Sequence, residues 1–187
     1  MEHVLNHLWP LRGPHDGRAV AGVFVAYLFL ATAWWNLGLP AGFESAGVVL
    51  LDLRAGWGLI DVQTLFVALG ESGRASYRTF ALLDMFYAIG TAVALGPLLA
   101  WPLERIRPGT WWARLPALVP WAAATLDILE NIGVLMLLDS WPSTDASLPL
   151  WTGTITLFKM ALVGLIPLTL ILSWLGYGVV KLIRKGA

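Results

Sequence analysis

Four long stretches of the chain are almost entirely apolar, and shorter polar segments separate them. They cover residues 19–39, 77–101, 115–138 and 150–180. A membrane-spanning helix needs about 20 consecutive, mainly apolar residues, and each stretch meets that length. The pattern therefore predicts an all-α fold, in which residues 1–187 form a single integral membrane domain built as a four-helix bundle.

The segment between the first two spans, residues 40–76, has a different pattern. Its middle part, residues 48–69, mixes apolar residues with Asp52, Arg54 and Asp61, so it is too polar to cross a membrane. The spacing is typical of one or two short amphipathic helices that lie at the membrane surface. We expect an interfacial packing element on the external side, and the alternative interpretation is a lid over a site beneath it.

The first span has a second interpretation as a cleavable signal peptide, because Ala31-Thr32-Ala33 resembles a cleavage site. The apolar run continues beyond this tripeptide through Trp34 and Trp35. We therefore interpret residues 19–39 as a retained membrane span.

Basic residues predict the orientation of the bundle. Only three flank the spans on the side of the first loop: Arg54, Arg74 and Arg78. The side that carries both termini has eight: Arg12, Arg18, Arg105, Arg107, Arg114, Lys181, Arg184 and Lys185. Cytoplasmic segments are enriched in Lys and Arg. We expect a multi-pass protein of the bacterial cytoplasmic (inner) membrane, with both termini in the cytoplasm.

Composition agrees with a membrane protein and excludes several kinds of site. The 187 residues are 58% hydrophobic and 13% charged, whereas soluble domains carry about 25% charged residues. The net charge is zero, so no nucleic-acid partner is expected. The chain has no cysteine, which excludes disulfides and thiolate chemistry, and its three histidines all lie in the N-terminal tail.

Four ionisable residues and one amide interrupt the predicted spans. Asp84 lies in the second span, Asp127, Glu130 and Asn131 lie in the third, and Lys159 lies in the fourth. A charge near the bilayer centre costs at least about 2.5–3.5 kcal/mol, so several such residues indicate a polar site. With a rise of about 1.5 Å per residue, the three spans bring these groups to similar depths in the outer half of the bilayer. Because lipid does not solvate them, we expect them to converge inside the bundle.

Helical spacing gives each span one polar face. The polar residues of the third span follow the i, i+3, i+4 spacing of a single face. Tyr77, Asp84 and Tyr87 share a face of the second span, and Trp35 ends the first span at a level where it could roof the site. The predicted site therefore has three catalytic candidates and five ligand-binding candidates: Asp84, Asp127 and Glu130, then Asn131, Lys159, Tyr87, Tyr77 and Trp35.

The charges of this site require neutralisation, because three acids face one lysine. Either at least one acid is protonated, which suits acid–base chemistry or a proton relay, or a cation is bound. Asp84, Asp127 and Glu130 could supply oxygen ligands to a divalent cation, but Lys159 would repel that ion. We therefore predict no metal and no other cofactor. The simplest alternative is a packing role, in which Lys159 pairs with Glu130 or Asp127 only to fix the helices.

Two motifs carry a resemblance to other proteins. The first is the run LGESGRASYR, which begins at Leu69 and is followed by Asp84 and Tyr87. The second is DILEN, which begins at Asp127 and is accompanied by Lys159 in the last span. Together they resemble a widespread group of small, uncharacterised four-span membrane proteins. The resemblance covers most of the chain beyond the N-terminal tail and implies the same spans and site residues, without implying an activity.

Three functions are compatible with the predicted site. The first is an intramembrane enzyme that performs acid–base chemistry on a lipid or isoprenoid, with Asp84 and Glu130 as the acid–base pair. The second is a proton- or cation-coupled transporter or channel, and the third is a protein that binds a lipid-like or small cationic ligand without turnover. Membrane lipids, such a ligand and a second copy of the chain in a homo-oligomer are the expected partners. We place the enzyme slightly ahead of transport, because the inner half of the bundle offers no polar path.

Overall fold

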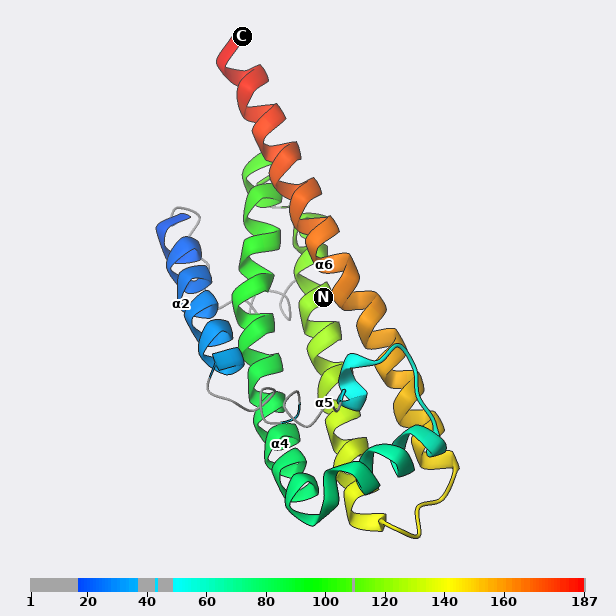
Figure 1. The fold of residues 1–187 in the computed structure, drawn as a ribbon. Helices are drawn as coiled ribbons and strands as arrows, with labels where there is room; N and C mark the ends of the chain where they lie inside the picture. Colours follow the sequence, from blue (N-terminus) through cyan, green and yellow to red (C-terminus); the bar gives the residue numbers. More distant parts are fainter. Residues whose placement is uncertain (1–16, 37–42, 44–48, 109, 187) are drawn as a thin grey trace.

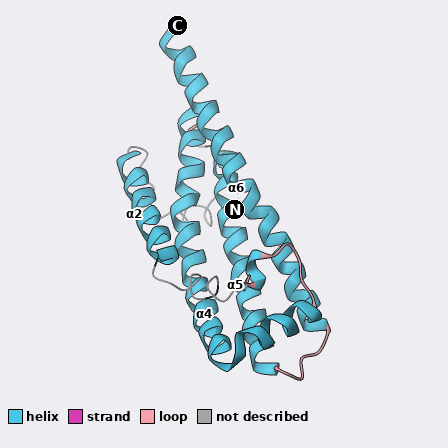
Figure 2. Cartoon of the chain, viewed as in Figure 1, coloured by secondary structure: helices cyan, strands magenta, loops and turns pink. Residues whose placement is uncertain are grey.

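Helices make up almost all of the described chain. The computed structural model describes residues 17–36, 43, 49–108 and 110–186. Within these residues every regular element is helical (Figure 2). In chain order, the elements are α2 (Gly17–Asn36), η1 (Leu51–Leu53), α4 (Leu59–Ile106), η2 (Trp111–Ala117), α5 (Leu118–Ser140) and α6 (Ser147–Gly186).

The four long helices alternate in direction along the chain (Figure 1). α2 begins, α4 ends, α5 begins and α6 ends toward one end of the bundle, which we call the terminal end. The opposite end, where α5 connects to α6, is called the loop end. Each long helix is apolar and long enough to cross a membrane. The predicted four-helix membrane bundle is therefore confirmed.

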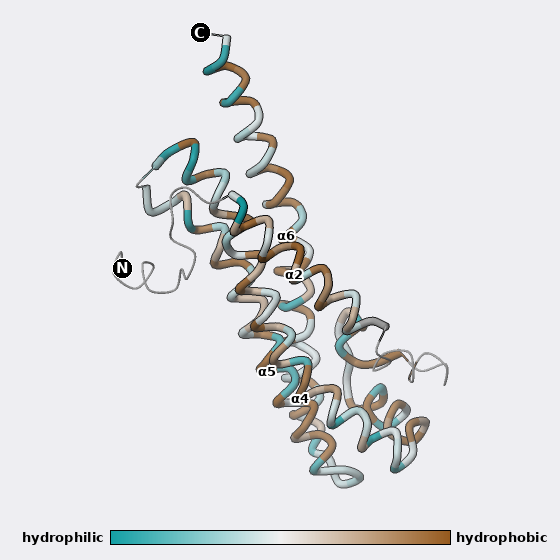
Figure 3. Tube along the Cα trace, turned by 90° about the vertical axis from the view of Figure 1, so that its left-hand side faces the viewer, coloured by the Kyte–Doolittle hydropathy of each residue, from teal (hydrophilic) through white to brown (hydrophobic). Residues whose placement is uncertain are grey.

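Large apolar side chains cover the outside of the bundle. Phe29 on α2 is 76% exposed, Phe86 on α4 is 73% exposed and Leu182 on α6 is 72% exposed. Hydrophobic residues follow most of the length of the helices (Figure 3). Such surfaces are costly in water but are solvated by lipid chains, which is consistent with a multi-pass integral membrane protein.

The helix that contains the second span begins earlier than predicted. Residues 59–69 form a short arm, which turns into the spanning part of α4 at Gly70 (φ 63°, ψ −170°). Glycine adopts this positive φ without the steric cost that other residues have. The Asp61 carboxylate accepts a hydrogen bond from the Gly58 amide at 2.9 Å and caps the start of the arm.

This arm lies within the part of the first loop in which short helices were expected. Val62, Leu65 and Phe66 are buried against the bundle, whereas Ile60 and Val67 are 77% and 69% exposed. The buried face joins a core at the loop end that also contains side chains from η1, the spanning part of α4 and α5, among them Leu51, Tyr77, Phe80, Val134 and Leu137. The core holds the arm and η1 against the loop end.

Two glycines allow α5, α6 and the first loop to approach closely. A Cβ atom on Gly133 of α5 would overlap the side chain of Thr152 on α6. A Cβ atom on Gly153 of α6 would overlap the backbone carbonyl of Trp57, just before the arm. Small residues at helix contacts permit such short separations in membrane bundles. This packing brings the polar faces of α5 and α6 together.

Candidate functional site

Lys159 joins the polar faces of α5 and α6. Its Nζ atom lies 2.9 Å from Asp127 Oδ1 and 2.5 Å from Glu130 Oε2. Lys159 is 8% exposed and Glu130 is 0% exposed. One ammonium group is thus held between two carboxylates that lie about one helical turn apart on α5. The predicted convergence of these three residues is confirmed.

A hydrogen-bonded chain continues from Glu130 to the first loop. Thr156 Oγ1 donates to Glu130 Oε1 at 2.8 Å. The indole Nε1 of Trp57 in turn donates to Thr156 Oγ1 at 3.0 Å. Because buried polar groups are costly without partners, these contacts tie the loop to the ion pair. No local pattern in the sequence points to Trp57, because its pairing depends on how the loop folds back onto α6.

Asp84 is joined to α5 through Asn131. The amide Nδ2 of Asn131 donates to Asp84 Oδ2 at 3.1 Å and to the backbone carbonyl of Asp127 at 3.0 Å. Both side chains are buried. Asn131 therefore holds the Asp84 carboxylate of α4 at the same level as the ion pair between α5 and α6.

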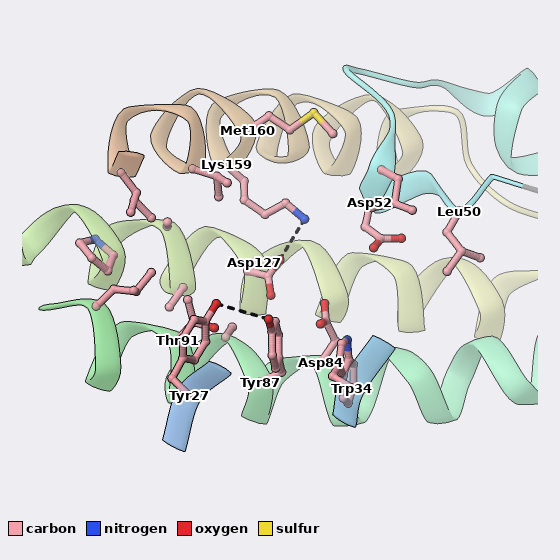
Figure 4. Close-up of a pocket in the computed structure, with 18 of the residues that line it drawn as sticks. Tyr27, Trp34, Leu50, Asp52, Asp84, Tyr87, Thr91, Asp127, Lys159 and Met160 are labelled. Atoms are coloured by element: carbon pink, nitrogen blue, oxygen red, sulfur yellow. Dashed lines mark hydrogen bonds and ion pairs between the residues drawn. The ribbon is translucent and has the colours of Figure 1, made fainter. Parts of the chain in front are cut away.

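A cavity of about 570 Å³ adjoins these groups and has two chemically different ends. At its polar end, the side chains of Asp52, Asp84, Asp127 and Lys159 lie close together (Figure 4). Apolar residues of α4, α5 and α6 line the part that extends toward the terminal end: Leu95, Pro120, Ala123, Val163, Ile166 and Pro167. The cavity is amphipathic and matches the shape of a molecule with a polar end and an apolar chain.

Aromatic side chains form one wall of this cavity. Trp34 of α2 stacks on Tyr87 of α4, with ring centroids 5.1 Å apart and planes 8° apart. Tyr27 stacks on the same tyrosine at 6.3 Å, and the two hydroxyl oxygens are 3.4 Å apart. Phe80 packs against Trp34 at 5.7 Å. All four residues line the cavity beside the carboxylates.

Asp52 is an acidic cavity residue that the sequence analysis did not assign to the site. It lies in η1, outside the spans, yet it lines the cavity. Its Oδ1 atom is enclosed by the protein, and the Tyr77 hydroxyl is a hydrogen-bonding group for this carboxyl. Burial raises the pKa of Asp52, and the Lys159 ammonium partly opposes that shift. Asp52 increases the number of acids around Lys159 to four, so the need for neutralisation is stronger than the spans alone indicated.

The other predicted residues occupy different positions around the cavity. Tyr87 lines it, whereas Glu130 and Asn131 lie behind its wall. Tyr77 is 1% exposed and belongs to the loop-end core. Trp35 lies at the end of α2, and its side chain is outside the described part of the structure. Its neighbour Trp34 is the tryptophan that lines the cavity.

Metal-ligating side chains do not cluster in the described part of the chain. No three His, Cys, Asp or Glu residues within it are placed so that they could hold one metal ion. The arrangement instead separates an ion pair, formed by Lys159 with Asp127 and Glu130, from Asp52 and Asp84. The site can therefore present carboxyl groups to a molecule in the cavity.

Comparisons with protein-family models, curated proteins and solved structures found no match. They identify no family, so the resemblance to small four-span membrane proteins stays a prediction. The structure shows a multi-span helical membrane protein with a buried, salt-bridged Asp/Glu/Lys site.

Proposed function

We propose that the protein takes a lipid or isoprenoid from the membrane into the cavity and performs acid–base chemistry on the polar end of that molecule. One observation carries this proposal: a single cavity has carboxyl groups at one end and an apolar lining at the other. Pockets for small molecules are commonly apolar with a few convergent polar groups. A single-chain amphiphile satisfies both ends at once.

Asp84 is the best candidate for the group that exchanges a proton with the ligand. It lines the cavity, and Asn131 fixes one of its oxygens. Asp52, which also faces the cavity, is the candidate for its acid–base partner. Four acids around one lysine leave room for a protonated carboxyl beside an ionised one, the arrangement that acid–base catalysis uses.

Glu130 and Asp127 fit a supporting role better than the catalytic roles first predicted for them. Glu130 is fully buried and its two oxygens meet Thr156 and Lys159. Asp127 lines the cavity but is already paired with Lys159. In this proposal, the pair with Lys159 fixes the negative potential of the site and orients α5.

The positions of basic residues support an orientation for this reaction. Arg105, Arg114 and Lys181 lie toward the terminal end, which favours a cytoplasmic location for that end. The polar end of the cavity would then face the outer half of the bilayer. Apolar residues at the other end, such as Leu95 and Ile166, argue against a continuous ion path through this cavity.

The test uses purified protein reconstituted with bacterial lipid extract and a mixture of polyprenols. We expect mass spectrometry to show a lipid or isoprenoid that changes with wild-type protein and does not change with Asp84→Asn. The control Asp139→Asn alters an exposed aspartate that pairs with Arg78 at the surface, so it should keep full turnover. Proton or cation flux without a changed molecule would support transport, and saturable binding without either would support a non-catalytic receptor; both results would overturn the proposed chemistry.

A further inference from the structure

The polar end of the cavity has more acid than its lysine neutralises. Lys159 is shared between Asp127 and Glu130, at 2.9 Å and 2.5 Å. No ion pair links Asp52 or Asp84 to a cation within the described residues. An anionic headgroup would meet like charges here, which is unfavourable in a low-dielectric site.

Asp52 adds a second acid to the same end of the cavity. It lies in η1 and lines the cavity, and its charged form is stabilised by the Lys159 ammonium and by a hydrogen bond from the Tyr77 hydroxyl. These groups only partly offset the cost of enclosing the carboxylate, so its pKa stays raised. A positive charge within the cavity would stabilise it further.

The aromatic wall selects among positively charged ligands. Trp34, Tyr87 and Tyr27 form a stacked group beside the carboxylates, with Phe80 next to Trp34. Aromatic faces attract organic cations, and ammonium groups are recognised by aromatic residues in this way. A small hydrated metal ion would gain little from these rings, and the described acids do not form a metal cluster.

We propose that the ligand is a single-chain amphiphile whose polar end is an organic ammonium group. The ammonium lies between the carboxylates of Asp52 and Asp84 and the rings of Trp34 and Tyr87. The alkyl chain extends along the apolar lining toward Val163 and Ile166. This inference rests on the proposed use of the cavity as a ligand site, and it adds the charge class of the ligand.

The lateral side of the cavity is suited to a ligand that arrives from the membrane. α2 contributes Tyr27 and Trp34, and α6 contributes Met160 and Val163, across a floor made by α4 and α5 (Figure 4). α2 packs on α4, and in Figure 1 α2 and α6 lie on opposite sides of α4. The two helices are therefore separated along this side of the bundle. A chain could therefore enter between α2 and α6 without leaving the bilayer.

Equilibrium binding of radiolabelled dodecyltrimethylammonium to the full-length protein in neutral-lipid nanodiscs tests this assignment. We expect saturable binding that unlabelled dodecylamine displaces and that dodecyl sulfate displaces at least about tenfold less well. Trp34→Leu should weaken binding by about tenfold or more, the size of a desolvated cation–aromatic contact. Asp84→Asn should also weaken binding by about tenfold or more, because it removes a negative charge that faces the ammonium group. Equal displacement by the sulfate and the amine would overturn the inference.

Matched variants separate binding from folding. Phe29→Leu changes an exposed aromatic residue of the same helix as Trp34, and Asp139→Asn changes an exposed acid; both should bind as the wild type does. Thermal unfolding checks that Trp34→Leu is folded, and unchanged binding by that folded variant would contradict the proposed aromatic contact. Turnover of a neutral isoprenoid without ammonium binding would reject this ligand class and leave the proposed chemistry standing. Ammonium binding without any turnover would support this ligand class and reject the proposed chemistry.

Discussion

A single ammonium group satisfies two carboxylates in the centre of this protein. Lys159 is 8% exposed, and its partner Glu130 has no exposed surface. Taking charges out of water costs several kcal/mol per ion, which pairing must offset. The pair is therefore sensitive to the loss of its cation, because the fully buried Glu130 and the partly buried Asp127 would then have no counter-charge.

Replacing Lys159 tests whether its pairing offsets the cost of burying these charges. We expect Lys159→Met to lower the free energy of unfolding by about 3–5 kcal/mol, the usual cost of leaving a buried ion unpaired. The double variant Lys159→Met/Glu130→Gln should recover part of that loss, because it removes one of the two unpaired charges. Thermal unfolding of the purified proteins in a neutral detergent measures both effects.

The exposed Lys181 of the same helix provides the control. Lys181→Met removes a cation that lies 5.8 Å from the ring of Tyr177 at the surface, and it should change the unfolding temperature little. If Lys159→Met were as stable as Lys181→Met, the buried acids would have to be neutralised by something other than Lys159, such as their own protons.

At the scale of helices, the site depends on how closely α5 and α6 pack. We predict that Gly153→Ala destabilises the bundle by about 1–3 kcal/mol, the usual cost of overpacking, because the added Cβ meets the backbone of Trp57. Gly133→Ala should cost at least as much, because the added Cβ meets Oγ1, Cγ2 and Cβ of Thr152, and rotating this β-branched side chain leaves one γ atom in the contact. The unfolding temperature of each variant, together with its yield of folded protein in detergent, ranks the variants by stability.

Gly164 on the same helix gives the matched comparison. A Cβ atom there has nothing within 4 Å, and alanine favours helices by up to about 1 kcal/mol over glycine. Gly164→Ala should therefore be neutral or slightly stabilising. A Gly153→Ala protein that behaved like Gly164→Ala would show that the contact with Trp57 is not needed for the fold.

The elements show what the sequence predicts well and what it does not. The length of an apolar run is set by bilayer thickness, so α2, α5 and α6 begin and end near their predicted limits. A charge in a span is costly enough to signal a site, which identified Asp84, Glu130 and Lys159. No local sequence pattern predicts that a loop residue such as Asp52 lies beside the cavity.

Asp52 and Trp57 depend on that longer-range folding. The arm turns at Gly70 and buries Phe66 in the loop-end core, and this packing brings η1 to the cavity. Polarity alone made residues 48–69 resemble a surface element, because the same acid suits water or a polar site. The sequence analysis paired Glu130 with Asp84 for acid–base chemistry, and this role stays a prediction; in the structure, the contacts of Glu130 with Thr156 and Lys159 enclose it, and it is not a lining residue of the cavity.

At the scale of the whole molecule, the polar groups occupy one end of the cavity and the apolar lining occupies the other. The long helices run along the axis between these two ends, and α2 ends short of the loop end (Figure 1). The function proposed for this site depends on which end faces the cytoplasm, because that would determine the leaflet that supplies the ligand and the compartment that exchanges protons with the site.

The proposed orientation can be measured because the natural chain has no cysteine. Ser143→Cys introduces an exposed thiol in the loop between α5 and α6, and Lys185→Cys introduces one near the end of α6. With the terminal end in the cytoplasm, a membrane-impermeant maleimide should label Ser143→Cys in intact bacterial cells and label Lys185→Cys only after permeabilisation. The cysteine-free protein is the negative control for labelling. Labelling of both variants in detergent shows that both thiols are accessible. The opposite pattern would place the acidic end of the cavity toward the cytoplasm, so that its ligand would come from the inner leaflet and its protons from the cytoplasm.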